Sequence, residues 1–195
     1  MRIACLHTAA SNAAVFDAAC PPGESLTHAV RPDLLAAAEA AGGLTPEIAA
    51  ETAEVLRRLD GDAVLLTCST LGPAAGYAGA QRADAALAAR ACAGGGSVEV
   101  LCAAPSTLRV TAELFATAAQ GTPARVTLRL VPGAWALFHR GDLAGYAEAI
   151  AKDAEASRAD VVALAQVSMA PAARLARRPV LTVPEAALAA CLERS

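Results

Sequence analysis

The sequence contains few aromatic residues, a single lysine and no run of basic residues longer than two. Aromatic residues make up 3% of the 195 residues, and the formal net charge is −3, from 16 basic and 19 acidic residues. Proteins that bind nucleic acid use clustered cations for the phosphates and, for single strands, aromatic side chains on which the bases stack. The sequence offers neither feature, so we expect no nucleic-acid partner.

Long apolar stretches are also missing. An uncharged stretch at residues 63–80 is interrupted by Gly72, Pro73 and several hydroxyl side chains. A membrane-spanning helix needs ~20 consecutive, mainly apolar residues, and the N-terminal MRIACLH lacks the apolar length of a signal peptide. We therefore expect a cytoplasmic protein with no membrane partner.

The six cysteines form no CxxC pair and have no regular spacing. Regular cysteine spacings indicate a zinc site or a disulfide framework, so the sequence predicts neither, and we expect no metal. A free cysteine is most often a small buried hydrophobe. We interpret all of them in this way except Cys68; the six are Cys5, Cys20, Cys68, Cys92, Cys102 and Cys191.

The rest of the composition is typical of a globular protein, with 55% hydrophobic and 18% charged residues. Short apolar runs alternate with alanine-rich stretches of helical period, which favours an α/β fold with a mainly parallel sheet. The runs expected to form strands are residues 2–7, 63–67, 98–103, 125–131, 161–165 and 179–183.

Helix starts are marked between these runs. Thr45, Pro46 and Glu47 combine a capping residue, a first-turn proline and an acid, which indicates that a helix begins there. Residues 33–41 are expected to form the preceding helix. Ser106 and the pair at 141–142 are expected to open two more helices, the second running to residue 157.

Polar side chains follow four of the expected strands, at residues 7–12, 67–70, 106–107 and 165–168. In open parallel sheets, ligands bind outside the carboxyl ends of the strands. The four clusters are therefore expected to lie at the functional edge of the fold.

Cys68 differs from the other cysteines in its surroundings. It follows an apolar run, lies among hydroxyl side chains, and precedes a helix start expected at Gly72 and Pro73. Backbone N–H groups and the positive end of a helix favour a thiolate, and the same groups hold carboxylates. The alternative is a cysteine packed under a loop.

Seven stretches resemble the aspartate/glutamate/hydantoin racemase superfamily, in the family's order and over almost the whole chain. TCST within DAVLLTCSTLGP and LAQVSMA within ADVVALAQVSMA are specific when taken together. The other matching stretches are LHTAASNAAVFDAA, AAGGLTPEIA, APSTLRVTAELF, VPGAWALFHRGD and PVLTVPEAAL.

This resemblance implies an α/β fold of two Rossmann-like lobes, each with a parallel sheet, related by pseudo-two-fold symmetry with the active site in the cleft between them. The first lobe would comprise residues 1–94 and 178–195, and the second residues 95–177. Enzymes of the family need no cofactor, act on small substrates that carry a carboxylate, and are often homodimers. The implied activity is that of an isomerase of the racemase type or a related lyase.

Family racemases use two cysteines, one on each face of the substrate's α-carbon. Cys68 matches the first, but Gln166 stands where the second is expected. An amide cannot exchange protons near neutral pH, so the resemblance and this departure together imply proton transfer by a single thiolate. Gln166 would then donate hydrogen bonds to an oxyanion or carboxylate. His7, at the end of the first strand, is the candidate for a second acid or base, and satisfying a local backbone group is its alternative role.

The resemblance also implies which side chains hold the substrate's carboxylate. They are hydroxyl or amide side chains that follow strands, and helix capping is the alternative for Ser106 and Ser168. The candidates are Ser11, Asn12, Ser69, Thr70, Ser106, Thr107 and Ser168.

Three functions remain open from the sequence. The first is an enzyme that acts beside a carboxylate through Cys68 alone. The second is a protein of the same fold that binds a small carboxylate without turnover. The third is a two-base isomerase in which His7 replaces the missing thiol.

Overall fold

The computed structural model describes residues 1–193, and its contacts divide the chain into two units. The first comprises Met1–Asp84 and the C-terminal segment from Pro184, and the second comprises Ala85–Val183. Each unit contains one four-stranded sheet in which every pairing is parallel. The α/β fold with parallel sheets expected from the sequence is therefore confirmed.

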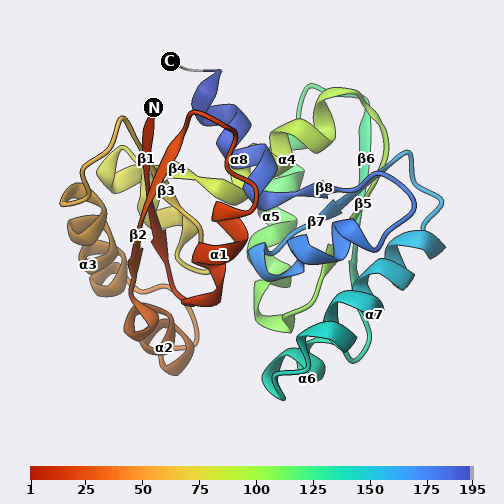
Figure 1. The fold of residues 1–195 in the computed structure, drawn as a ribbon, viewed down its shortest axis with the longest axis horizontal. Helices are drawn as coiled ribbons and strands as arrows, with labels where there is room; N and C mark the ends of the chain where they lie inside the picture. The colour runs from red at the N-terminus through yellow and green to blue at the C-terminus, as the bar shows by residue number, and fades with distance from the viewer. Residues whose placement is uncertain (194–195) are drawn as a thin grey trace. The chain divides into compact units, whose positions relative to one another are not determined.

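The sheet of the first unit has the strand order β2-β1-β3-β4, and Figure 1 shows β1, β2 and β3 side by side. Strand β1 pairs with both β2 and β3, so it lies inside the sheet. The strands are β1 (Arg2–His7), β2 (Ser25–Val30), β3 (Ala63–Leu66) and β4 (Gln81–Arg82).

One face of this sheet packs against α2 (Pro32–Ala40), α3 (Pro46–Arg57) and the 3-10 helix η1 (Gly72–Ala78). The apolar stripe of α3 supplies Ile48, Ala49 and Leu56 to the core, where they meet Leu6 and Leu66 from the strands. Thr45 caps α3 as expected, because its hydroxyl oxygen accepts a hydrogen bond from the Ile48 N–H over 3.4 Å.

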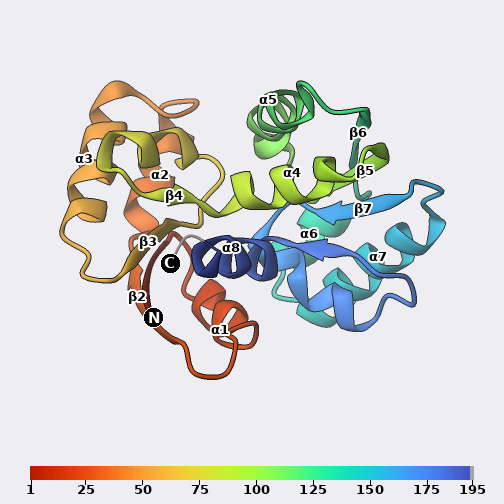
Figure 2. The ribbon, with the colours of Figure 1, turned by 90° about the horizontal axis from the view of Figure 1, so that it is seen from above.

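The opposite face of the first sheet carries Ile3, Cys5 and His7, because side chains alternate along a strand. All three are fully buried. Figure 2 shows α1 (Ser11–Asp17) and α8 (Val183–Leu192) on the opposite face of this sheet from α2 and α3. Phe16 of α1 packs against the ring of His7, with ring centroids 5.4 Å apart.

The sheet of the second unit has the order β6-β5-β7-β8. Its strands are β5 (Gly96–Cys102), β6 (Ala124–Leu130), β7 (Val161–Leu164) and β8 (Leu181–Thr182). The helices of the unit are α4 (Ala83–Ala93), which begins in the first unit, α5 (Leu108–Ala119), α6 (Ala134–His139) and α7 (Leu143–Ala156), with two 3-10 helices, η2 (Pro105–Thr107) and η3 (Val167–Arg174).

One face of the second sheet packs against α6, α7 and η3, and Figure 2 shows α4 and α5 on the other face. Tyr146 and Ile150 of α7 meet Leu101 and Leu164 of the strands in this core. Asp142 caps α7, since its carboxylate accepts from the Gly145 N–H over 2.9 Å, as the sequence predicts.

All six expected strands are present, and two strands were not expected. β2 is an edge strand whose sequence, SLTHAV, mixes polar and apolar residues, and β4 has only two residues. The helix expected at Gly72 and Pro73 is the 3-10 helix η1. Among residues 1–193, no helix combines the length and apolar character that a membrane span requires.

The contacts divide the chain at other positions than the lobe boundaries at 94/95 and 177/178 expected from the sequence, and those boundaries stay a prediction. The contacts place the division after Asp84 and after Val183. Strand β8 pairs with β7, which assigns residues 181–182 to the second sheet. The segment that returns to the first unit is therefore α8.

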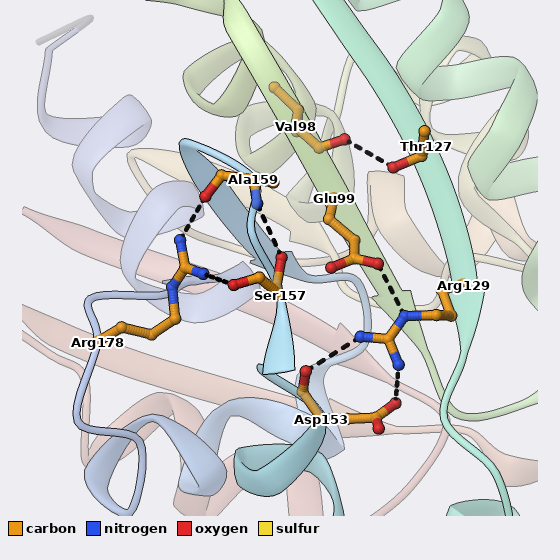
Figure 3. Close-up of polar contacts among 8 residues, drawn as sticks. All are labelled: Val98, Glu99, Thr127, Arg129, Asp153, Ser157, Ala159 and Arg178. Carbon is orange, nitrogen blue, oxygen red and sulfur yellow. Dashed lines mark hydrogen bonds and ion pairs between the residues drawn. The ribbon is translucent and has the colours of Figure 1, made fainter. Parts of the chain in front are cut away.

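Two arginines tie the second unit's strands to the chain around α7 (Figure 3). Arg129 on β6 donates to the carboxylate of Glu99 over 2.7 Å and binds both the carboxylate and the backbone carbonyl of Asp153. Arg178 donates to the carbonyl oxygens of Ser157 and Ala159 over 2.7 and 2.6 Å. The Arg178 bonds fix the loop between α7 and β7, and the Arg129 bonds tie α7 to β5 and β6.

We expect Arg129→Met to lower the free energy of unfolding by about 1.5–3 kcal/mol, because hydrogen bonds to charged groups contribute that much and two carboxylates lose their partner. Urea unfolding measures the change. Arg109→Met is the matched control, because the Arg109 side chain is 76% exposed in its pair with Glu113 and such pairs contribute only about 0.3–0.5 kcal/mol. Equal losses in both variants would contradict the assignment.

Candidate active site

The carboxyl ends of β1 and β3 bring Thr8 and Cys68 together. The two strands pair in parallel from Ile3 opposite Ala63 to Leu6 opposite Leu66. The pairing continues past β3, because the Thr67 N–H donates to the Leu6 carbonyl over 3.1 Å. The residues that follow the two strands therefore meet at one edge of the sheet, as the sequence predicts.

The Cys68 thiol receives three hydrogen bonds and is nevertheless held neutral by burial. Burial is the largest influence and raises the pKa of Cys68, while hydrogen bonds from the Thr8 side chain and from the backbone N–H groups of Leu71 and Thr70 lower it. The charge of Asp84 raises it further. The lowered pKa expected from the sequence is therefore not found, because burial outweighs the N–H donors of the loop.

The loop after Cys68 is closed by its own backbone. Ser69 is buried, and its carbonyl oxygen accepts from the Gly72 N–H over 3.1 Å. Thr70 is half-buried beside it. Both predicted carboxylate ligands thus lie on the loop that donates to the thiol.

Arg82 lies against this loop and was missed by the sequence analysis. A Cβ atom added at Gly72 would come within 2.6 Å of the Arg82 guanidinium, so the arginine side chain would have to shift. Arg82 donates to both carboxylate oxygens of Asp84, over 3.0 and 2.8 Å. The only sequence signal for this pair is its spacing, Arg-Ala-Asp, at the end of a two-residue strand.

Thr8 was also absent from the predicted ligands, although its position carried a signal. It directly follows β1, at the edge where Cys68 follows β3. Ser11 and Asn12, which were predicted, form the first turn of α1, with Ser11 exposed and Asn12 half-buried. Neither of these two side chains hydrogen-bonds to another residue within 1–193, so both remain available to a ligand.

His7 is placed differently from the acid or base expected of it. Its ring is fully buried, with Nδ1 2.8 Å from the Thr67 hydroxyl and Nε2 2.9 Å from Nδ1 of His28. Burial first, and then the charge of His28, lowers the pKa of His7 to about 4, against an opposing effect of Asp17. Both ring nitrogens are engaged, so this arrangement does not favour proton exchange with a substrate.

In the second unit, Gln166 follows β7 and bonds to the end of β5. Its side-chain oxygen accepts from the backbone N–H groups of Ala103 and Ala104, over 2.6 and 2.9 Å. We expect Gln166 to donate to an oxyanion or carboxylate, and that role belongs to its amide nitrogen rather than to this oxygen. Its amide nitrogen takes no part in these two bonds and remains a donor.

The Ser-Thr pair after β5 forms the 3-10 turn η2 ahead of α5. Thr107 is buried and its hydroxyl donates to the Ala104 carbonyl over 2.8 Å. Ser106 is exposed and makes no capping bond, so the capping alternative is wrong for Ser106. Its hydroxyl stands near the carboxyl edge of the second sheet and makes no hydrogen bond to another of residues 1–193.

Ser168 lies in η3, and its hydroxyl is 2.9 Å from the Tyr146 hydroxyl. Burial, opposed by the bond to Ser168, raises the pKa of Tyr146 to about 12. The phenol therefore stays protonated, and Ser168 has a partner in the core rather than a capping role.

Comparison with solved structures finds the same fold in racemases and a decarboxylase. Allantoin racemase from Pseudomonas fluorescens has 18% identity and a TM-score of 0.70, with 99% of this chain and 90% of that chain covered. The aspartate racemase of Picrophilus torridus has 11% identity and a TM-score of 0.72, with coverages of 99% and 93%. Unliganded arylmalonate decarboxylase has 14% identity and a TM-score of 0.53, with coverages of 98% and 91%.

Searches of protein-family models and of curated proteins give no match to the sequence. The similarity to solved structures nevertheless spans nearly the whole of both chains. The fold expected from the racemase-like motifs is therefore confirmed, at identities that establish the fold alone.

We expect the alkylation rate of Cys68 by iodoacetamide to rise with pH and to reach half its maximum above ~8.5, the ordinary pKa of a free thiol, because burial raises its pKa. Mass spectrometry of the peptide that contains Cys68 measures the rate. Thr8→Val should move the midpoint higher still, since it removes a hydrogen bond that favours the thiolate. Thr117→Val, on the surface of α5, is the control and should leave it in place. A midpoint below that of a free thiol would contradict the buried, neutral state.

Proposed function

We propose that this protein is a cofactor-independent enzyme that transfers a proton at the carbon next to a carboxylate of a small acid, with Cys68 as the single acid or base. One observation carries the proposal: the Cys68 thiol lies at the carboxyl edge of a parallel sheet, among donors from Thr8, Thr70 and Leu71. The racemases and the decarboxylase of similar fold support the reaction class.

The state of the thiol favours proton donation. Because burial raises the pKa of Cys68, the free protein holds S–H rather than S⁻ at neutral pH. In decarboxylation of a malonate, the bond from the α-carbon to one carboxylate breaks and its electron pair stays on the α-carbon as an enediolate. Cys68 then gives its proton to that carbon, CO₂ leaves, and water returns a proton to the thiolate.

The same group can act in the opposite direction. A Cys68 thiolate removes the α-proton of one enantiomer, the resulting thiol exchanges that proton with water, and the thiol then gives a solvent-derived proton to the same face of the carbon. Such a cycle exchanges the α-proton with solvent and keeps the configuration. Inversion needs a second titratable group on the other face, and Gln166 provides none.

Hydroxyl and N–H donors at the two sheet edges supply candidate ligands for the carboxylate. In the first unit we propose Ser11, Asn12, Ser69 and Thr70. In the second we propose Ser106 and the amide nitrogen of Gln166, with Thr107 and Ser168 supporting them, because the hydroxyls of these last two already have partners.

A second candidate is a carboxylate-binding protein without turnover. The raised pKa of Cys68 favours this candidate, because a thiol that stays protonated is unreactive, as a structural cysteine is. The two candidates separate on Cys68, because a binder keeps its affinity when the thiol is replaced.

We expect wild-type protein, incubated in D₂O with a panel of amino acids, hydantoins, malonates and maleate, to produce exchange, decarboxylation or a double-bond shift in at least one compound. Cys68→Ser should lower that rate by ~10²-fold or more, the contribution typical of a positioned acid or base. Proton NMR of substrate and product measures it.

Cys102→Ser is the matched control, because Cys102 is a buried cysteine at the end of a strand and takes no part in the proposed reaction. Saturable binding of a panel member with no turnover, and with equal affinity in Cys68→Ser, would establish the binder in place of the enzyme. An equal loss of rate in both variants would show that Cys68 acts through stability rather than chemistry.

We expect Gln166→Cys to gain racemisation of a compound whose α-proton the wild type exchanges with retention, because it restores a titratable group at the position of the family's second thiol. Chiral chromatography measures the ratio of enantiomers. Gln166→Ser loses the same hydrogen bonds without gaining a thiol and should not racemise. Racemisation by the wild type would contradict proton transfer by a single thiol.

A further inference from the structure

Three side chains that bind metals well lie together beneath α1, on the face of the first sheet that carries Cys5 and His7. In the parallel pairing of β1 with β2, Cys5 stands opposite His28, so both side chains point to one face together with His7. The Cys5 sulfur and one ring nitrogen of each histidine all lie within 4.8 Å of one another. Cys5 and His7 are fully buried, and the His28 side chain is 18% exposed.

Hydrogen bonds determine which ring nitrogen of each histidine carries the proton. In both rings it is the outer nitrogen, the one that faces away from the other histidine. The Thr67 hydroxyl lies 2.9 Å from the Leu6 carbonyl oxygen, which can only accept, so the hydroxyl proton points there. The same hydroxyl then accepts from Nδ1–H of His7 over 2.8 Å. At the other end, Nε2–H of His28 donates to the Asp17 carboxylate over 3.0 Å.

These assignments leave two lone pairs facing each other. A neutral imidazole has one N–H, and each ring spends it on its outer partner. The inner nitrogens, Nε2 of His7 and Nδ1 of His28, are 2.9 Å apart. Two lone pairs at that distance repel, so the arrangement requires a cation between them, which is either an added proton or a metal ion.

We propose that Cys5, His7 and His28 bind a divalent transition-metal ion, Zn²⁺ in the first instance, at a structural site separate from the Cys68 reaction. The buried thiol beside the two nitrogens favours the metal over the proton, because a proton between the rings uses only two of the three ligands. The fourth position of a tetrahedral site is left to water.

The spacing of the two inner nitrogens is close to that in a zinc site. Zn–N bonds of about 2.0–2.1 Å in a tetrahedral site place two nitrogens ~3.3 Å apart, so the inner nitrogens would separate by ~0.4 Å from their present 2.9 Å. The bonds from the outer nitrogens to Thr67 and Asp17 are those that ligand histidines usually make. On binding, Cys5 loses its proton to solvent, and the charges of its thiolate and of Asp17 together balance the metal.

We expected no metal from the sequence, and there is a structural reason why these three residues were not recognised as ligands. Cys5 and His7 come from one strand and His28 from the next, which is the edge strand β2 that the sequence pattern did not predict. No spacing typical of zinc ligands links the three residues.

We expect the full-length protein, freed of metal by a chelator and titrated with Co²⁺, to bind one ion per chain with the near-ultraviolet absorption of a thiolate–cobalt bond. Zn²⁺ should displace the cobalt and raise the thermal midpoint. Cys5→Ser should abolish the thiolate band, and His28→Gln should weaken Zn²⁺ binding by at least ~100-fold, because loss of a ligand outweighs the ~10–100-fold effect typical of an outer partner. Asp17→Asn should weaken binding within that range.

Matched controls separate this site from other ligands. Cys102→Ser and His139→Gln remove a buried cysteine and an exposed histidine of the second unit, and Cys68→Ser removes the proposed catalytic thiol; all three should bind as the wild type does. His28 is partly exposed, so His28→Gln remains informative if Cys5→Ser does not fold. The proposal would be overturned if His28→Gln bound metal as the wild type does, or if Cys68→Ser lost the thiolate band. It would also be overturned if the wild type bound no metal, and a proton between the rings would then be the explanation.

Discussion

The parallel pairing of β1 with β3 positions both proposed sites. Its register runs from Ile3 opposite Ala63 to Leu6 opposite Leu66, so the chains continue in step into His7-Thr8 and Thr67-Cys68. Alternation then sends His7 and Thr67 to the face beneath α1, while Thr8 and Cys68 meet at the edge of the sheet. A slip of one residue would exchange these faces and would separate both pairs at once.

Partial burial at this edge raises the pKa of the Cys68 thiol, which bears on the proton transfer proposed for it. The Cys68 thiol is partly buried and lies among N–H and O–H donors, and these two influences act in opposite directions; the effect of burial is the larger and raises the pKa. A thiol that is neutral at rest suits the donation of a proton to a carbanion formed in the site. The donors around it then stabilise the thiolate after the proton has left, which is the stage at which negative charge appears on sulfur.

The parts of the molecule that follow from local patterns were predictable, and those that depend on pairing between distant strands were not. Cys68 stood out because an apolar strand, hydroxyl side chains and glycine-proline are contiguous around it. His7 was judged from its neighbours in sequence, but its ring partners, Thr67 and His28, are 60 and 21 residues away. The edge strand β2 lacks a continuous apolar run, so neither the strand nor the cluster it completes with Cys5 could be recognised.

Gln166 shows that a departure from a family's pattern can have a structural role as well as a chemical consequence. Its side-chain oxygen satisfies two backbone N–H groups, of Ala103 and Ala104, at the end of β5, and buried N–H groups left without partners are costly. A cysteine side chain is two atoms shorter and its sulfur is a weak acceptor, so it could not replace these bonds. The residue that removes the second thiol therefore also ties the ends of β5 and β7 together.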